Sequence, residues 1–311
     1  MVTAVSTQNT YSVILADLLS AQNKEMTAQQ QVSTGKKGSD LTAFGDQTRT
    51  LVATTTVKSR VDGLVGQLNN LQVKMNFQQA ALGQISDVAA NLKQSITNAL
   101  ASGQGDGVMS DVQSYFSQAS QALNSQYGGD FLFSGGQTQT QPFTATDLAN
   151  LTTGTTASFF KNGNLTPTNR VDDSTTVQTG FLASNVGQPL MQVFQDIQNF
   201  QQGASGNFGG QLTAAQQTFL QTELATLNGV VTSTIQTTAQ GGDVQKRIED
   251  ATKAQTDRQT TLTNVLGDIT DVNTAKAATD LSQAQSAVQA SAQVFLTLKG
   301  MSLLNYLTSG V

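Results

Sequence analysis

The chain has 311 residues, a net charge of −5 and no cysteine, histidine or tryptophan. It therefore lacks the usual ligands of zinc, copper, haem and iron–sulfur centres, and the usual bases and thiol nucleophiles of enzymes. The acidic balance and the absence of a clustered basic stripe argue against a nucleic-acid-binding face. We expect a protein that is not an enzyme and that uses no cofactor and no metal.

The first 35 residues predict an amphipathic helix with few charges, whose apolar stripe includes Leu15, Leu18 and Leu19. Such a helix associates readily with copies of itself. The segment has neither a basic n-region nor a small-residue cleavage site, so it does not have the features of a secretory signal. No window approaches the roughly 18 consecutive apolar residues of a membrane span, so we expect no membrane partner. A cytosolic location is the simplest interpretation, and export without a cleaved signal is the alternative.

Residues 61–99 carry the strongest pattern, in which apolar residues follow alternating steps of three and four that only Gln78 breaks. No proline interrupts this heptad repeat, so it predicts one helix about 58 Å long with a narrow apolar seam. A seam this narrow needs a partner helix. We expect antiparallel packing within the subunit through Leu64, Leu68, Leu71, Leu82, Ile85, Leu92 and Ile96.

Between Phe131 and Ser184 the composition changes to Thr, Gly and Asn. The string TTASFFKNGNLTP predicts a strand that ends in a hairpin turn at Asn162-Gly163, and TTVQTGFLAS predicts a second strand. We therefore expect a small β-rich insert. Phe131 and Phe133 are expected core residues at its start, where Gly135 either allows a turn with positive φ or only adds flexibility.

Three other patterns do not support a catalytic or ligand site. Asp172-Asp173 lacks the spaced carboxylates of a calcium loop, so we interpret it as a solvated turn. The glycines of residues 203–210 follow no predicted strand and precede no P-loop lysine, which indicates a linker. Three lysines are candidates for a Ser–Lys nucleophile: Lys36, Lys37 and Lys161. Lys36 follows Ser33 and Lys161 follows Ser158 at S-x-x-K spacing, but so short a match alone does not indicate a catalytic pair.

The C-terminal part returns to helical periodicity, with Pro189 near the first turn of one predicted helix and Gly241-Gly242 at the join to the last. The rhythm slips near residues 271–280, and a weakly charged apolar stripe ends the chain with Leu298, Leu303, Leu304 and Leu307. We predict a mainly α fold. In it, the N- and C-terminal arms (1–130 and 185–311) form a long antiparallel coiled-coil hairpin, and residues 131–184 form a small β-rich outer insert.

Several strings resemble the bacterial flagellin family. QVSTGKKGSD (31–40) is similar to the segment after the family's first helix, and SLLNYL (302–307) is similar to the end of its terminal helix. FLFSGGQTQTQPF (131–143) is similar to the string that leads into the outer domain of members at the hook–filament junction. RVDDSTTVQTGFLAS (170–184) is similar to the strand pair that closes that domain. The resemblance spans nearly the whole chain.

The resemblance implies a structural subunit that joins the flagellar hook to the filament by helix-mediated self-assembly. Its partners would be copies of itself, hook-associated proteins, flagellin and a type III export chaperone. It would be exported without a cleaved signal and act outside the cell, in the flagellum. The contact between subunits would use the terminal stripes (Leu15, Leu18, Leu19, Leu298, Leu303, Leu304 and Leu307). Filament flagellin is the first alternative, and a secreted flagellin-like adhesin or binding module is the second.

Overall fold

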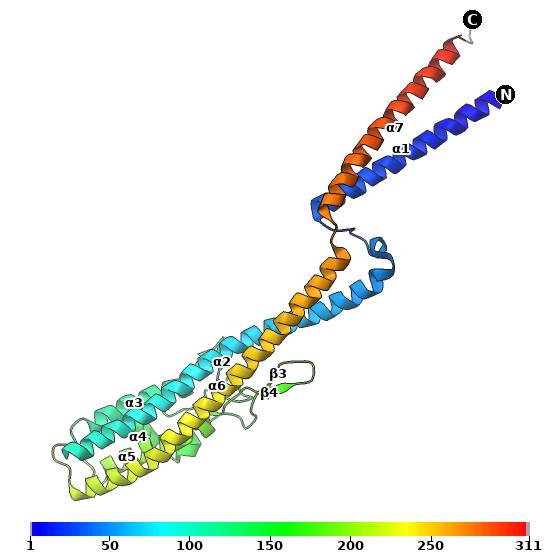
Figure 1. Ribbon diagram of the computed structural model, residues 1–311. Helices are drawn as coiled ribbons and strands as arrows, with labels where there is room; N and C mark the ends of the chain where they lie inside the picture. The colour runs from blue at the N-terminus through cyan, green and yellow to red at the C-terminus, as the bar shows by residue number, and fades with distance from the viewer. Residues whose placement is uncertain (1, 309–311) are drawn as a thin grey trace. The chain divides into compact units, whose positions relative to one another are not determined.

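The computed structural model describes the backbone of residues 2–308 and the side chains of residues 12–297. Over these residues the chain is mainly helical, with two antiparallel sheets of two strands each (Figure 1). This confirms the predicted fold class. The elements, in chain order, are α1 (Val2–Thr34), the 3-10 helix η1 (Leu41–Gln47), α2 (Thr48–Ser102), α3 (Val108–Leu123), β1 (Gln126–Tyr127), β2 (Asp130–Phe131), α4 (Leu148–Leu151), the 3-10 helix η2 (Thr156–Phe159), β3 (Thr168–Arg170), β4 (Thr176–Gln178), α5 (Ala183–Gln202), α6 (Ala214–Thr270) and α7 (Thr274–Thr308).

The chain forms two compact units. The terminal unit contains the chain up to Val61 and from Arg258 onward, and the central unit contains residues 62–257. Helices α2 and α6 each contribute residues to both units. The boundaries at residues 131 and 184 stay a prediction.

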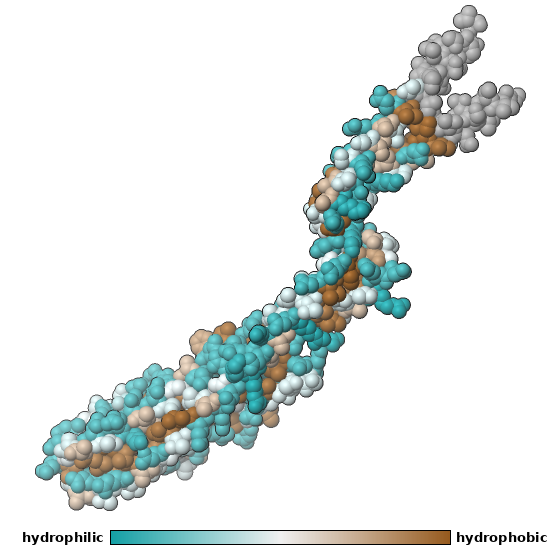
Figure 2. All heavy atoms as spheres, in the orientation of Figure 1, coloured by the Kyte–Doolittle hydropathy of each residue, from teal (hydrophilic) through white to brown (hydrophobic). Residues whose placement is uncertain are grey.

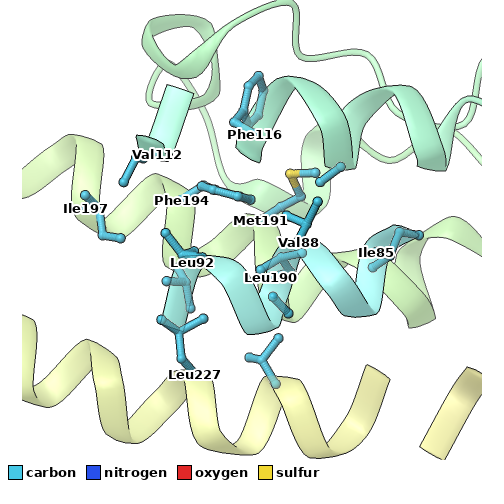
Figure 3. Close-up of a cluster of buried hydrophobic side chains, with 14 of the residues drawn as sticks. Ile85, Val88, Leu92, Val112, Phe116, Leu190, Met191, Phe194, Ile197 and Leu227 are labelled. Carbon is cyan, nitrogen blue, oxygen red and sulfur yellow. The ribbon is translucent and has the colours of Figure 1, made fainter. Parts of the chain in front are cut away.

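The main core of the central unit lies between four helices. Seam residues of α2 belong to one buried cluster with side chains of α3, α5 and α6. Figure 3 shows Leu92, Phe194 and Leu227 converging from α2, α5 and α6. The predicted two-helix packing is therefore extended by α3 and α5, which also cover the seam. Four of the predicted seam residues are at most 1% exposed here: Leu82, Ile85, Leu92 and Ile96.

The turn between α2 and α3 is a feature that the sequence analysis missed. Gly103 and Gly107 have φ angles of 68° and 87°, in the left-handed region that glycine tolerates without a steric penalty. Gly107 is the residue just before α3. These glycines end α2 and let α3 fold back onto it, so that Phe116 joins the core at 2% exposure.

A second buried cluster lies nearer the N-terminal end of α2, around residues 64–75. Leu68 and Leu71 pack there with Ile248 of α6 and with two valines of the β3–β4 segment, and Leu64 packs against it half-buried. The antiparallel register pairs Asn169 with Val177. The hairpin therefore covers the part of the α2 seam that α3 and α5 do not reach.

The prediction for Gly241-Gly242 was wrong, because both residues lie inside α6 and not at a join. A Cβ atom on Gly241 would lie 2.2 Å from Oε1 of Gln79 and 3.0 Å from Cδ1 of Leu82. Gln79 also donates a hydrogen bond to the carbonyl of Thr238 at 3.0 Å. Gly241 is therefore a point of close approach between α6 and α2.

Two local predictions for the middle of the chain were also wrong. The segment before Asn162 forms η2 and not a strand, and Phe160 forms an isolated bridge with the distant Phe143. Asn162 makes no hairpin turn, since its side chain accepts from Ser184 N at 3.0 Å and donates to Ser184 Oγ at 3.1 Å. The second predicted strand is present as β4. Helix α5 begins at Ala183, which places Pro189 in its second turn.

Candidate assembly surface

Helices α1 and α7 of the terminal unit lie side by side and antiparallel (Figure 1). Their most buried described side chains are alanines: Ala21 and Ala28 on α1 and Ala277 and Ala284 on α7, all at most 7% exposed. The spacing of seven residues on both helices is the heptad step of a coiled-coil seam. Alanine has no bulk beyond Cβ, so the two backbones approach each other closely.

The larger apolar side chains of this pair stay in solvent. Leu15 is 41% exposed, Leu19 is 52% exposed and Leu296 of α7 is 65% exposed. Figure 2 shows such apolar side chains open on the α1–α7 pair among polar ones. Large apolar residues at heptad-like spacing that face water are typical of a protein–protein contact surface. The other exposed apolar residues of the two helices are Val13, Met26, Val32 and Val294.

The predicted assembly residues have different surroundings. Leu15 and Leu19 are exposed on α1, and Leu18 is half-buried. The side chains of Leu298, Leu303, Leu304 and Leu307 lie outside the described residues. Their role in contacts between subunits stays a prediction.

A groove runs between α1 and α7 on the same surface. Its lining includes Ala16, Leu19, Ala28, Ala284 and Ala287. Its remaining lining is mostly uncharged and polar, with Lys24 and Asp280 as its two charged residues. A groove of this composition can accept an apolar helix face, because few charged side chains would lose contact with water when the helix covers it.

Helix α1 ends at a motif that the sequence analysis recognised only by resemblance. Gly35, with φ of 69°, follows the helix and donates from its N–H to the carbonyl of Gln31 at 2.9 Å, as a C-terminal glycine cap does. Val272 N then donates to Gly35 O at 3.0 Å, and Lys37 N donates to Thr270 O at 2.8 Å. These bonds form an antiparallel bridge between residues 35–37 and 270–272, where α6 gives way to α7.

The two lysines of this motif stabilise the same junction. The Lys37 ammonium donates to the carbonyls of Asp268 and Ile269, at 3.0 and 2.7 Å, where α6 leaves its last carbonyls unpaired. The Lys36 ammonium forms an ion pair with Asp271. Hydrogen bonding from Lys36, and then from Thr270, holds the pKa of Asp271 below its usual value.

Helix α7 has its own start signal. The Asn273 side chain accepts a hydrogen bond from Lys276 N at 3.0 Å, the contact of an N-cap residue with the third helical position. The slip predicted near residues 271–280 therefore corresponds to a complete break between two helices. Each side of the break is capped, so the α1–α7 pair begins at a defined residue.

The start of the predicted insert is built into the core of the central unit. Phe133 is fully buried, and its carbonyl accepts a hydrogen bond from Ala183 N at 2.9 Å. Gln78, the residue that breaks the heptad, is 1% exposed and donates to the carbonyl of Leu132 at 3.0 Å. Gly135 has φ of 65°, and a Cβ there would lie 2.8 Å from Leu165 O, so a glycine is needed for both reasons. Phe131 is half-buried in β2.

Other kinds of site find no support in the part of the chain that the structure describes. No group of three or more Asp, Glu, His or Cys side chains there could hold a metal ion. None of the helices described combines the length and apolar character needed to cross a bilayer. The Asp172-Asp173 pair lies in the β3–β4 turn, where Arg170 Nε donates to Asp172 O at 2.8 Å.

Among known protein families, a match is found for the C-terminal helices. Residues 224–307, which cover most of α6 and nearly all of α7, match the family model of the bacterial flagellin C-terminal helical region. This part of the chain is therefore similar to the C-terminal helical region of flagellin. Comparison with curated proteins found no match to this chain.

Many solved structures match the fold of this chain, including the following two. One, from Vibrio parahaemolyticus, is described as a proposed flagellar hook-associated protein. It has a TM-score of 0.58 and 15% identity, with 72% of this chain and 97% of that chain covered. The other is FlgL of Bacillus cereus, with a TM-score of 0.53 and 12% identity, covering 70% of this chain and 98% of that chain. The likeness therefore extends beyond the flagellin-type C-terminal region to most of the fold.

Proposed function

We propose that the protein is a structural subunit of the bacterial flagellum that joins the hook to the filament. The observation that carries this proposal is the pairing of α1 with α7 through alanines, which leaves Leu15, Leu19 and Leu296 exposed. Neighbouring copies would cover these side chains. The flagellin-type region in residues 224–307 supports the same role, because it includes the helix that presents half of this surface.

The junction role is supported by the string that begins at Phe131 and by the fold shared with a hook-associated protein and with FlgL. The protein would then act outside the cell and contact hook-associated proteins and flagellin. It would leave the cell by the flagellar type III route with an export chaperone. Filament flagellin is the second candidate, because the matching family model is that of flagellin.

The contact energy can be estimated from two side chains. Burying a whole leucine side chain contributes about 1.5–3 kcal/mol, and Leu15 and Leu19 each have roughly half of that surface left to bury. Together they would contribute about 2 kcal/mol to each contact between subunits. That corresponds to a change of about 30-fold in an association constant.

The test is a full-length variant with Leu15→Ser and Leu19→Ser, compared with Ile235→Ser. Ile235 is an exposed apolar residue of the central unit, at 54% exposure, and serves as the matched control. We expect the double variant to fold normally by circular dichroism and to need about 30 times more protein for assembly onto flagellar fragments. Equal assembly of the double variant and the control would contradict the proposed mechanism.

A further inference from the structure

We propose that the central unit binds an acidic saccharide, a sugar chain that carries carboxylate groups. The site is a cleft of about 560 Å³ between α2, the β1–β2 turn and β3. This volume lies in the range of small-molecule sites. All of its lining residues belong to the central unit, and the proposal is independent of the role of α1 and α7.

One wall of the cleft is a single face of α2. Asn70 and Lys74 are four residues apart, so they lie next to each other on the helix surface. Leu68 and Leu71 lie beneath them, at 1% and 9% exposure, and belong to the buried cluster that holds the β3–β4 segment to α2. The cleft therefore has a rigid apolar floor and a polar wall.

The opposite wall depends on a tight hairpin. Gly128 and Gly129 have φ angles of 62° and 88°, as the two central residues of a type I′ turn require. The turn pairs Tyr127 with Asp130 in the antiparallel register, so their side chains point to the same side of the hairpin. Both line the cleft.

An aromatic pair stands beside these polar groups. The Tyr127 ring lies 5.3 Å from the ring of Phe77, which is 51% exposed and three residues after Lys74 on α2. Aromatic faces contact the apolar C–H side of a sugar ring, while amides and charged groups bond its hydroxyls. The cleft offers polar contacts through Asn70 and Lys74, and the aromatic pair lies next to them.

The unused hydrogen-bonding groups favour a negatively charged ligand. Within the described chain, the Lys74 ammonium, the Asn70 amide and the Tyr127 hydroxyl have no hydrogen-bond or ion-pair partner, and all three can donate. Asp130 already accepts a hydrogen bond from Gln139 at 2.5 Å. The central unit has fourteen acidic and seven basic residues. Of the two basic residues that line the cleft, Arg170 is ion-paired with Asp173, so Lys74 is the unpaired cation that suits a carboxylate.

The binding test uses the full chain and three probes of equal length: a galacturonic acid trisaccharide, a neutral maltotriose and a glutamate tripeptide. Isothermal titration calorimetry should show binding of the galacturonic acid trisaccharide, with at least about tenfold weaker affinity for the neutral sugar, because a charge-assisted hydrogen bond is lost. The peptide should bind more weakly than the acidic sugar, since it has no ring to stack on Tyr127. Binding of the peptide as tightly as the acidic sugar would overturn the saccharide assignment, and so would no binding of the acidic sugar.

Two lysine variants locate the site. Lys74→Met should weaken the binding of the acidic trisaccharide by about tenfold or more, because it removes the free ammonium and keeps the side chain's length. Lys93→Met changes another half-buried lysine of α2 outside the cleft, and it should bind like the unmodified protein. Both variants should retain the helical circular dichroism of the parent. Equal affinities of the two variants would place the binding elsewhere and overturn the proposal.

Discussion

Glu223 of α6 should make the stability of the central unit depend on pH near neutrality. The residue is 6% exposed, and its Oε2 atom has no hydrogen-bond partner. Burial, and then the carboxylate of Asp196 on α5, raise the pKa of Glu223 from 4.5 to about 7. The perturbation that isolates this effect is Glu223→Gln, which keeps the shape of the side chain and removes its ionisation.

The direction of this pH dependence follows from which state, folded or unfolded, holds the Glu223 proton more tightly. The unfolded chain releases the Glu223 proton near pH 4.5, whereas the folded chain keeps it until about pH 7. Between these values the folded state binds more protons at this site, so the contribution of Glu223 to the free energy of unfolding is fully present below pH 4.5 and is lost as the pH rises to 7. At about 1.4 kcal/mol per pH unit, the difference is about 3 kcal/mol.

The assay is urea unfolding followed by far-ultraviolet circular dichroism on both sides of this window. Relative to the unmodified protein, Glu223→Gln should gain about 3 kcal/mol of stability between the acidic and the neutral side. Asp243→Asn changes an exposed carboxylate of the same helix and should show no such gain. If the difference in stability between Glu223→Gln and the parent stays constant with pH, then ionisation of Glu223 does not destabilise the fold.

Three further predictions concern packing and helix capping. Phe133→Ala should cost about 3–5 kcal/mol of unfolding free energy because it leaves a cavity at a fully buried site, while Leu165→Ala, at 75% exposure, should change it by less than about 0.5 kcal/mol. Gly242→Ala should stabilise α6 by up to about 1 kcal/mol, whereas Gly241→Ala should destabilise the unit because its Cβ meets α2; equal effects in thermal melts would contradict the close approach. Lys37→Met should weaken the end of α6 by about 1 kcal/mol, seen as faster hydrogen exchange at residues 267–272, and unchanged exchange would show that the cap contributes nothing.

The long helices were predictable because their signal is local. A heptad repeat without proline determines one helix, and its seam residues Leu82, Ile85, Leu92 and Ile96 are buried as such a pattern requires. The break at Gln78 was visible in the sequence, but its partner was not. That partner is the carbonyl of Leu132, 54 residues away, and no periodicity records a contact over that distance.

Other features were missed although local signals existed. The glycines at 103 and 107 mark the reversal into α3, and the pair Gly128-Gly129 marks the β1–β2 hairpin. Both were hidden in a region interpreted as one helical arm. The strand predicted before Asn162 failed because tertiary contacts with Phe143 and Ser184 outweigh the local β preference.

For the candidate assembly surface, the sequence identified the apolar stripes but not the direction each side chain takes. Leucines and alanines both fit a helical stripe. In the structure the alanines fill the α1–α7 contact, and Leu15 and Leu19 remain in solvent. The choice depends on how closely two helices approach, which is a property of the pair and not of either sequence alone.

The most direct test of the hook–filament role is electron microscopy of the purified protein after addition to flagellar fragments that carry hooks. A junction subunit should add a short, limited layer at the end of the hook and stop there, with antibody label confined to that boundary. Growth of long filaments from the same fragments by this protein alone would contradict the junction role and identify the chain as a filament flagellin.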